Sequence, residues 1–562
     1  MTQKKRILIC NDAHFLHSGY GKYAKEVLTR LAKTNKYEIA ELACFGEVND
    51  PRCEDVPWTY YANSVNEKHP QHDEYQSSES NKSGSWRFEQ VCLDFRADLV
   101  LDLRDIWVMS FESTSAYRPF FHHCIMPTID SDPQQDGWID IINSADSVLT
   151  YSDYGKKILE TQSNNNIVVS QVASPGVDLN VFTPASNKKE HRNLMGFMPD
   201  ANVIGTVMRN GSRKLYPDLF ETFKKFIDLC YDNDNKNLAE NTYLYAHCSY
   251  PDVGWEIPTL LREYELGRKV IFTYVCGRCN SVSCSFFRGP RGLCRECNSM
   301  NAILPNTKTG VSEKQLSDII NVFDIYIQYS TNEGLGIPQI EAAACGIPIM
   351  TLNYSGMEDI INKCHGINIP IKRMFRDHGT NCLRALPDND KTAELIMDLV
   401  SMPSDMIRMK GNKARKAAEK YYDWDNVAKI WENHIDNIEL TGLQGKWDSP
   451  MLPLKEYLPP LPQNYTGMNN TDFVNWIITE ILQDPKKLNS RFAHKIIKDL
   501  NFGSYRNGQS VDSFNKANLY VMAVKMADEQ YSCELARTGK MDIDTPDFIE
   551  YAHKRDAYLK LL

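Results

Sequence analysis

Residues 330–348 read Ser330-Thr-Asn-Glu333-Gly334-Leu335-Gly336-Ile-Pro338-Gln-Ile-Glu341-Ala-Ala-Ala-Cys-Gly346-Ile-Pro348. An apolar run precedes them, so the stretch predicts a buried strand, a glycine loop and a helix that begins near Pro338 and ends at Gly346. In such a loop, backbone N–H groups can approach a phosphate at the positive end of the helix. Glu333 and Glu341 can hold hydroxyl groups on two parts of one ligand, such as a sugar and a ribose. Taken alone, the same residues also fit an ordinary strand-to-helix turn.

Strand, loop and helix patterns continue outward from this stretch in two series. The first series opens with an apolar strand at 7–10, a loop over 11–21 and a helix from about Lys22. Its further strands are expected at 99–103, 123–128 and 147–150. The second series predicts a helix over 312–323, capped by Ser312 and Gln315, and strands at 203–208, 242–246, 269–274, 325–328 and 347–352. The alternation indicates an α/β fold with two doubly wound, Rossmann-like domains.

The length of 562 residues is too great for one hydrophobic core. Residues 46–86 are polar and predict a loop or insertion, and five prolines within 449–462 predict a semi-rigid linker. No feature of the sequence predicts an oligomeric state. We expect a first Rossmann-like domain at 1–190, a second at 191–440 with an insertion at 275–300, a Pro-rich linker at 441–465, and a helical appendage at 466–562.

Four cysteines form a cluster with the spacing Cys-x2-Cys-x14-Cys-x2-Cys: Cys276, Cys279, Cys294 and Cys297. Two such turns can present four thiolates to one tetrahedral zinc ion, with a ribbon between them. The spacer is slightly shorter than usual, and the alternative is a set of buried free thiols. Because four cysteine ligands leave no open coordination position, we expect a structural zinc and no catalytic one.

The overall charge limits what the protein can bind. The chain has 63 basic and 73 acidic residues, a net charge of -10, which argues against a general coat on DNA or on an anionic membrane. No apolar run reaches the roughly 18 residues that a bilayer requires. We therefore expect a protein without a transmembrane segment, located in the cytoplasm, or in the host cytoplasm if the protein is viral.

The Glu333 and Glu341 arrangement resembles the signature of retaining family-4 glycosyltransferases of the GT-B fold. Four other segments resemble the family in the same order along the chain: Ser174 to Pro184, Arg209 with Lys214, Tyr354 to Ile361, and Tyr421 to Val427. The resemblance covers about residues 5–438 and implies two domains facing a cleft. It also implies transfer of a sugar from a nucleotide sugar, most commonly a UDP-sugar, with the anomeric configuration retained and no catalytic metal.

The resemblance also implies roles for particular residues. Arg209 and Lys214 would stabilise the donor diphosphate, Glu333 would contact the donor sugar, and Glu341 would contact the ribose. Solvated surface cations are the alternative for Arg209 and Lys214. The other donor-binding residues would be Gly19, Gly21, Gly334, Leu335 and Gly336, although an ordinary tight turn also explains Gly19 and Gly21.

Asp130 stands where the family commonly has a catalytic-site histidine. It would bind the sugar or the acceptor hydroxyl, mark a changed donor sugar, or merely cap the next turn. Asp102, Arg104 and Asp105 follow a predicted strand and are further candidates for the cleft.

The cysteine-rich insertion carries the residues that bear on the acceptor. Phe286 and Phe287 are side by side there, among four arginines: Arg278, Arg288, Arg291 and Arg295. Basic residues mixed with aromatic ones suit a phosphate backbone and stacked bases. The sequence thus favours a hydroxymethylated base in DNA as the acceptor, as in some bacteriophage glycosyltransferases.

Three alternatives to this acceptor remain open. The insertion can be a zinc site that only stiffens a long loop, with its arginines solvated. The acceptor can instead be a surface glycan, a lipid-linked sugar or a protein. A non-catalytic nucleic-acid-binding protein with a degenerate transferase fold is the third. The basic helix expected at 406–420 is read as a solvated face rather than a membrane anchor.

Overall fold

The computed structural model describes residues 4–440 except 17, 49, 54–55, 70–71, 116 and 307–308, and beyond them 459, 461–483, 488, 493–494, 497, 515–517, 519–520, 522–524 and 527. The predicted linker thus lies mostly outside the described residues. In the predicted appendage, α18 (Asn470–Trp476) and η4 (Ile477–Leu482) belong to a separate apolar cluster. No helix among the described residues is long and apolar enough to cross a membrane.

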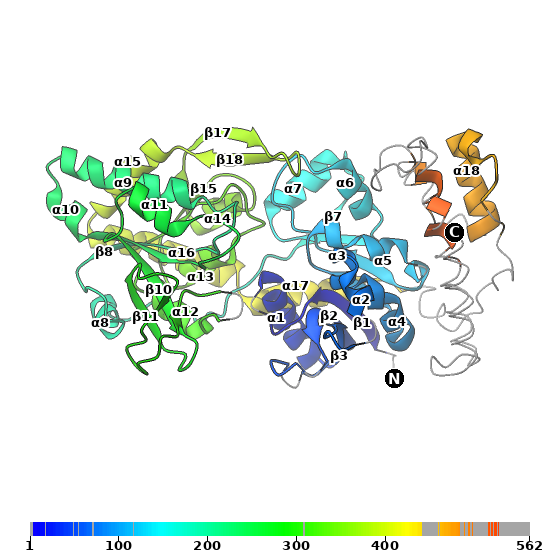
Figure 1. Cartoon of the computed structure of the whole chain (residues 1–562), viewed down its shortest axis with the longest axis horizontal. Coiled ribbons are helices and arrows are strands. Elements are labelled where there is room, and N and C mark those ends of the chain that lie inside the picture. Colours follow the sequence, from blue (N-terminus) through cyan, green and yellow to red (C-terminus); the bar gives the residue numbers. More distant parts are fainter. Residues whose placement is uncertain are drawn as a thin grey trace.

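The first lobe is built on a parallel seven-stranded sheet with the order β3-β2-β1-β4-β5-β6-β7 (Figure 1). Its strands are β1 (Lys5–Asp12), β2 (Tyr37–Glu47), β3 (Thr59–Ser64), β4 (Leu99–Asp102), β5 (His122–Ile125), β6 (Ser147–Thr150) and β7 (Val169–Val172). Its helices are α1 (Gly19–Lys33), α2 (His72–Gln76), α3 (Glu79–Lys82), α4 (Ser85–Phe95), η1 (Ile106–Val108), α5 (Ser110–Thr114), η2 (Arg118–Phe120), α6 (Asp136–Asn143) and α7 (Asp153–Gln162). The strand order reverses between β1 and β4, which is where doubly wound sheets bind ligands.

The second lobe is built on a sheet whose parallel core has the order β10-β9-β8-β14-β15-β16. Its strands are β8 (Asn202–Val207), β9 (Thr242–His247), β10 (Val270–Cys276), β14 (Ile325–Gln328), β15 (Ile349–Leu352) and β16 (Ile367–Ile369). Its helices are α8 (Lys188–Leu194), α9 (Tyr216–Asp232), α10 (Lys236–Asn241), α11 (Ile257–Glu263), α12 (Glu313–Ile320), α13 (Ile337–Ala344), α14 (Met357–Cys364) and α15 (Asn389–Val400). The predicted fold class, two doubly wound parallel sheets, is therefore confirmed.

The cysteine-rich insertion extends this second sheet. The strand β11 (Val282–Phe286) pairs antiparallel with β10, and β13 (Ala302–Ile303) pairs with the end of β10 and with β12 (Arg291–Gly292). Helix α12 begins with the predicted capping box, in which the Gln315 backbone N–H donates to Ser312 Oγ and the Ser312 N–H donates to Gln315 Oε1.

Two sequence predictions in the first lobe are wrong. Residues 46–86 are not one loop, because they contain β3, α2, α3 and the start of α4. The strand β3 pairs on one side only and is half-buried, so its sequence lacks the apolar run that marks a central strand. Helix α1 begins at Gly19 rather than Lys22, because Ser18 Oγ accepts the Gly21 N–H at 3.0 Å. Gly19 and Gly21 thus lie in the first turn of a helix.

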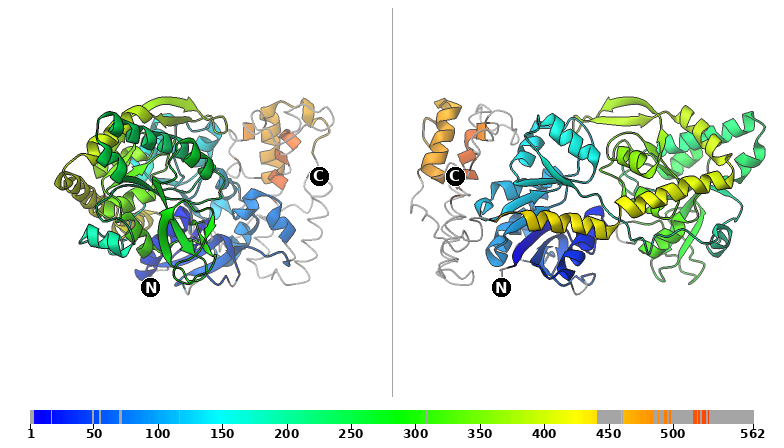
Figure 2. Two further views of the ribbon diagram at one scale, coloured as in Figure 1. Left: turned by 60° about the vertical axis from the view of Figure 1, so that its left-hand side comes forward. Right: turned by 180° about the vertical axis from the view of Figure 1, so that it is seen from behind.

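One pair of helices and one hairpin reach from the second lobe to the first. Helices α16 (Ser404–Tyr421) and α17 (Trp424–Asn437) run along the back of the molecule from the second lobe to the first (Figure 2). Trp431 of α17 donates its indole N–H to Tyr23 OH at 2.7 Å, inside the first lobe's core. The hairpin of β17 (Ile371–Arg376) and β18 (Leu383–Pro387) reaches the first lobe, where the Leu383 N–H donates to the Asp132 carbonyl at 2.7 Å.

Candidate active site

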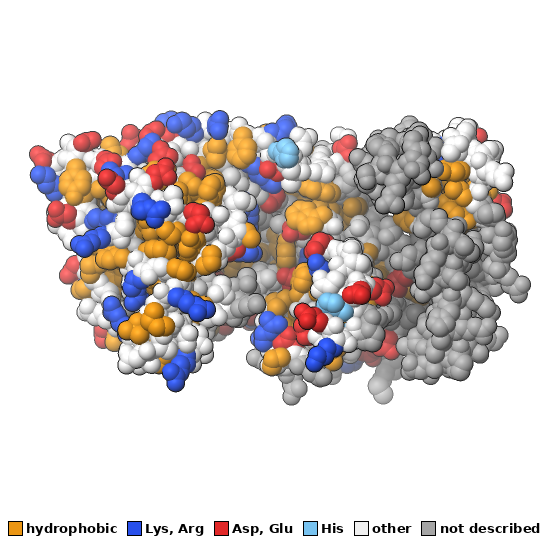
Figure 3. Space-filling view, in the orientation of Figure 1, with side chains coloured by type: hydrophobic (Ala, Val, Ile, Leu, Met, Phe, Trp, Pro, Cys, Tyr) orange, Lys and Arg blue, Asp and Glu red, His pale blue; other side chains and the backbone are white. Residues whose placement is uncertain are grey.

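A cavity of about 820 Å³ lies between the two lobes and is lined by both. Figure 3 shows the groove between the lobes on one face. The first lobe contributes the loop after β1 and the start of α1, and the second contributes the end of β8 and the loop between β14 and α13. The stretch singled out in the sequence, from Glu333 to Glu341, therefore forms much of one wall.

The N-termini of two helices meet at this cavity. Helix α13 begins after Gly336, whose φ of 95° favours glycine, and no side chain caps its N-terminus. A Cβ atom on Gly19, at the start of α1, would lie 3.6 Å from Ile337 of α13. The positive ends of both helices make the cavity attractive to an anion.

The carboxylate of Glu333 is held by cations and an amide. Its Oε2 accepts from Arg213 Nη1 at 2.6 Å, its Oε1 accepts from Gln328 Nε2 at 2.8 Å, and Lys214 Nζ also contacts Oε1. Its backbone N–H donates to Ser355 Oγ at 2.9 Å. The carboxylate is thus fixed in one position and only 5% exposed.

Backbone hydrogen bonds join the segment that carries Arg213 and Lys214 to the segment just before Glu333, and this brings both cations to the carboxylate. The Thr331 N–H donates to the Arg213 carbonyl at 3.0 Å, and the Leu215 N–H donates to the Tyr329 carbonyl at 3.1 Å. Burial and the neighbouring Arg213 lower the pKa of Lys214 well below its ordinary value of 10.5. Glu333 stabilises this buried ammonium in the free protein, and a negatively charged ligand in the cavity would stabilise it further.

Arg209 also lines the cavity, but it is paired with Asp252. The pairing is bidentate, with both nitrogen–oxygen distances at 2.9 Å, and it holds the pKa of Asp252 at about 2. Arg209 therefore lines the cavity while paired with Asp252, whereas Lys214 contacts Glu333.

Glu341 is paired with a lysine from the opposite lobe. Lys22 Nζ of α1 lies 2.9 Å from Glu341 Oε1 and 2.8 Å from Glu313 Oε1. Burial opposes the Lys22 charge, but the two carboxylates outweigh it and raise the pKa of Lys22. One oxygen of Glu341 is therefore engaged across the cleft.

Asp130 also joins the lobes. Its carboxylate accepts from Asn332 Nδ2 and from Arg384 Nη1, the latter at 3.3 Å. Asp105 lies nearby in the first lobe, where it accepts from Tyr20 OH at 2.7 Å, and burial raises the pKa of Asp105 to about 6.

Asp102 and Arg104, two of the further candidates for the cleft, lie in the core of the first lobe instead. Arg104 Nε donates to Asp102 Oδ1 at 2.9 Å, and both residues are buried. Arg104 also donates to the Ser83 carbonyl at 2.7 Å, so the pair connects elements of the lobe to one another.

Comparison with known proteins identifies the class of enzyme to which this cleft belongs. Residues 307–416, which include Glu333 and Glu341, match the family model described as Glycosyl transferases group 1. The protein is a glycosyltransferase. No curated protein sequence matches the chain.

Solved glycosyltransferase structures share the fold. Sucrose-phosphate synthase from Thermosynechococcus elongatus is 14% identical, with a TM-score of 0.56 over 77% of this chain and 98% of that chain. HepE from Anabaena, in complex with UDP and glucose, is 12% identical, with a TM-score of 0.51 over 77% of this chain and 100% of that chain. WaaG, a glycosyltransferase involved in lipopolysaccharide biosynthesis, is 12% identical, with a TM-score of 0.50 over 75% of this chain and 99% of that chain. At these identities the likeness shows the GT-B fold.

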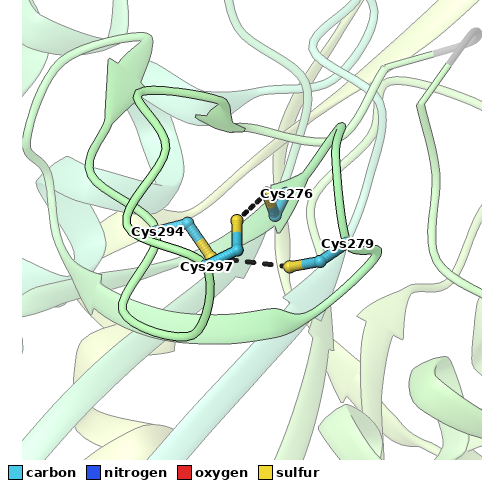
Figure 4. A group of neighbouring side chains, drawn as sticks. All are labelled: Cys276, Cys279, Cys294 and Cys297. Carbon is cyan, nitrogen blue, oxygen red and sulfur yellow. Dashed lines mark hydrogen bonds between the residues drawn. The ribbon is translucent and has the colours of Figure 1, made fainter.

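The four cysteines that were predicted to bind a metal lie close together in the insertion of the glycosyltransferase (Figure 4). Their Sγ atoms all lie within 4.8 Å of one another, with Cys276 and Cys297 3.6 Å apart and Cys279 and Cys294 3.7 Å apart. Tetrahedral zinc–sulfur bonds of about 2.3 Å place sulfur atoms roughly 3.8 Å apart, so the donor set fits such an ion. The cluster is thus suited to a structural metal.

The insertion lies beside the cleft without lining it. Its Asn280 carbonyl accepts from Gln315 Nε2 of α12 at 3.1 Å, and Glu313 and Leu316 of α12 line the cavity. No residue of the ribbon between Cys276 and Ile303 is among the described residues that line the cavity.

The arginines and the phenylalanines of the ribbon differ in exposure. Among the described residues, none of the four arginines forms an ion pair, and all four are exposed: Arg278, Arg288, Arg291 and Arg295. Phe287 packs on Phe272 at 5.6 Å between ring centroids, and Phe286 packs on Tyr243 at 6.2 Å. The two phenylalanines therefore contact the lobe rather than forming a free stacking surface.

Sequence reasoning missed several residues of the site. Arg213 directly precedes Lys214, which was predicted to bind the diphosphate, so its position in the sequence could have identified it. Gln328 is the last residue of a predicted strand, and its place at the carboxyl end of that strand, where such sheets bind ligands, could also have identified it. Lys22 gave no signal, because its two partners are far away in the sequence.

Proposed function

We propose that the protein transfers a sugar from a UDP-sugar to an acceptor hydroxyl, with retention of the anomeric configuration. The observation that carries this proposal is the convergence of Lys214, Arg213 and the uncapped start of α13 on one side of the cavity. Cations and N–H donors are what a departing diphosphate needs as its negative charge grows. The likeness to HepE, which has been captured with UDP-glucose, supports UDP as the nucleotide.

In this proposal the donor lies along the second lobe. Lys214 and Arg209 bind the diphosphate together with the backbone of Gly334, Leu335 and Gly336. Glu333 accepts hydrogen bonds from the sugar hydroxyls, and Glu341 accepts from the ribose through the oxygen that Lys22 leaves free. The departing phosphate takes the acceptor proton, so the chemistry requires neither a catalytic metal nor a dedicated base.

The first lobe faces the reacting sugar. Gly19 and Gly21, in the first turn of α1, bring the positive end of that helix towards the diphosphate. The contacts of Asp130 with Asn332 and Arg384 support a role in holding the lobes closed around the donor, with its carboxylate near the acceptor hydroxyl.

For the acceptor, we propose a hydroxymethylated base in DNA, such as bacteriophages contain. The four exposed arginines without ion pairs support this acceptor, because they offer counter-charges to a phosphate backbone next to the helix that borders the cavity. The packed phenylalanines give no support to base stacking on the ribbon.

A DNA-binding measurement tests this acceptor. The double variant Arg288→Gln/Arg291→Gln should bind a duplex containing 5-hydroxymethylcytosine about tenfold more weakly, and the slope of log affinity against log salt should fall by about 1.8. Arg408→Gln, on α16 and paired with Asp405, is the matched control. Unchanged affinity and slope in the double variant would remove the ribbon from the acceptor site, and transfer to a glycan with none to this duplex would replace DNA as the acceptor.

A glycan acceptor is the second candidate, favoured by the exposed Trp107, which packs on the half-buried Trp138. Trp107 is 58% exposed and lies 5.8 Å from Trp138 between ring centroids. Asp105, two positions before Trp107, accepts from Tyr20 OH, and Tyr20 lines the cavity. Exposed tryptophans are enriched where proteins bind other molecules.

We infer that the metal at the cysteine cluster is zinc. Metal analysis of the full chain should find about one zinc per molecule, and Cys279→Ser should lose it and lower the melting temperature. Cys284→Ser is the matched control, because Cys284 lies in β11 of the same ribbon and outside the cluster. A stable, zinc-free protein purified without chelators would contradict this assignment.

A further inference from the structure

His14 in the first lobe is held by a buried carboxylate. It follows β1 and lines the cavity, and it is 3% exposed. Its backbone N–H donates to Glu41 Oε1 and its Nδ1 contacts Glu41 Oε2, both at 2.8 Å. Trp58 Nε1 donates to the same Oε2 at 3.0 Å. Because the Glu41 carboxylate accepts these bonds, Nδ1 carries a hydrogen, and in the neutral imidazole Nε2 is then an acceptor.

The other nitrogen of the ring has no partner. His14 Nε2 is buried and makes no hydrogen bond to any described residue. Three aromatic rings surround the imidazole edge-on, those of Phe15, Trp58 and Tyr60, at centroid distances of 5.2, 5.5 and 6.1 Å. A buried polar atom without a partner is unfavourable and uncommon in native proteins, and because His14 is among the residues that line the cavity, a ligand bound there can supply the partner.

The position of His14 indicates which substrate supplies the partner. The charged groups suited to the donor, including Lys214, Arg213 and Glu333, belong to the second lobe, whereas His14 and Glu41 belong to the first. We propose that His14 Nε2 accepts a hydrogen bond from a hydroxyl group of the acceptor, and that Glu41 is the positioning residue that fixes the imidazole tautomer. This inference rests on the proposed transferase function and adds an acceptor subsite to it.

Two reactions of the full-length protein separate acceptor binding from donor binding. Hydrolysis of UDP-glucose, measured without acceptor, requires the donor site alone. Transfer to a duplex containing 5-hydroxymethylcytosine requires the acceptor as well. The variants are His14→Ala, His14→Gln and Glu41→Gln, with His72→Ala on α2 as a histidine control outside the cavity lining.

We expect His14→Ala to raise the KM for the duplex about tenfold while hydrolysis stays within twofold of the unaltered protein, which also shows that the variant is folded. His14→Gln should recover most of the loss, because the glutamine amide reaches the position of Nε2. Glu41→Gln should raise the KM for the duplex less than His14→Ala does, with hydrolysis kept. Equal losses of hydrolysis and transfer, or no change in either, would overturn the proposal.

A failure of the proposed function gives a different result. If the unaltered protein hydrolyses UDP-glucose but does not modify the duplex, the DNA acceptor fails, and glycerol at molar concentration replaces it. His14→Ala should then lower the ratio of glucosyl glycerol to free glucose about tenfold, and an unchanged ratio would overturn the role of His14. If the unaltered protein neither hydrolyses nor transfers, the proposed donor is wrong, and the proposal for His14 falls with it.

Discussion

Glu333→Ala should lower the rate of sugar transfer about 10²- to 10³-fold, the size of effect seen when one preorganised polar contact to a transition state is removed. The carboxylate is fixed by Arg213, Lys214 and Gln328, so its position relative to a bound donor does not depend on side-chain rearrangement. Steady-state transfer from UDP-glucose measures the effect.

The choice of control matters for this variant, because removing Glu333 also leaves Lys214 and Arg213 without their partner. Glu333→Gln keeps the shape of the side chain and should lose as much activity with less disturbance. Glu394→Ala, an exposed glutamate on α15, should behave like the unaltered protein. Full activity in both Glu333 variants would exclude the proposed donor contact.

Lys214→Met should also lower transfer about 10²- to 10³-fold, yet leave the free protein at least as stable. The folded-state pKa of Lys214 lies below its unfolded value, so the unfolded chain binds this proton more tightly. The amine therefore weakens folding at neutral pH, and this effect fades as the pH rises towards 10.5. Methionine removes the titrating group and keeps the buried volume.

Thermal melting and transfer kinetics together test this prediction. We expect an unchanged or higher melting temperature at pH 7 with little remaining transfer, and UDP should no longer stabilise the variant. Lys413→Met, at an exposed position of α16, should change neither quantity. A large loss of stability without loss of transfer would mean that Lys214 serves the fold rather than the donor.

The sequence predicted the parts of the fold that depend on local patterns. Apolar runs gave the central strands, including β6 and β14 with the observed bounds, and Ser312 with Gln315 marked the start of α12. The edge strand β3 was missed because one free edge and a half-exposed face remove the apolar run.

The contacts across the cleft could not be predicted in the same way. Lys22 and Glu341 are 319 positions apart, and Arg384 and Asp130 are 254 apart, so only the folded arrangement of two lobes brings them together. The same holds for His14, whose buried partner Glu41 belongs to a strand that was not predicted. By contrast, the four cysteines were predictable, because metal-ligand spacing is itself a local pattern.

The most direct test of the central claim is a structure of the full-length protein with UDP. We predict that the diphosphate lies between the lobes, with its oxygen atoms within hydrogen-bond distance of Lys214 Nζ and of the backbone N–H groups at the start of α13. UDP bound away from this cavity, or no bound UDP at saturating concentration, would contradict the claim.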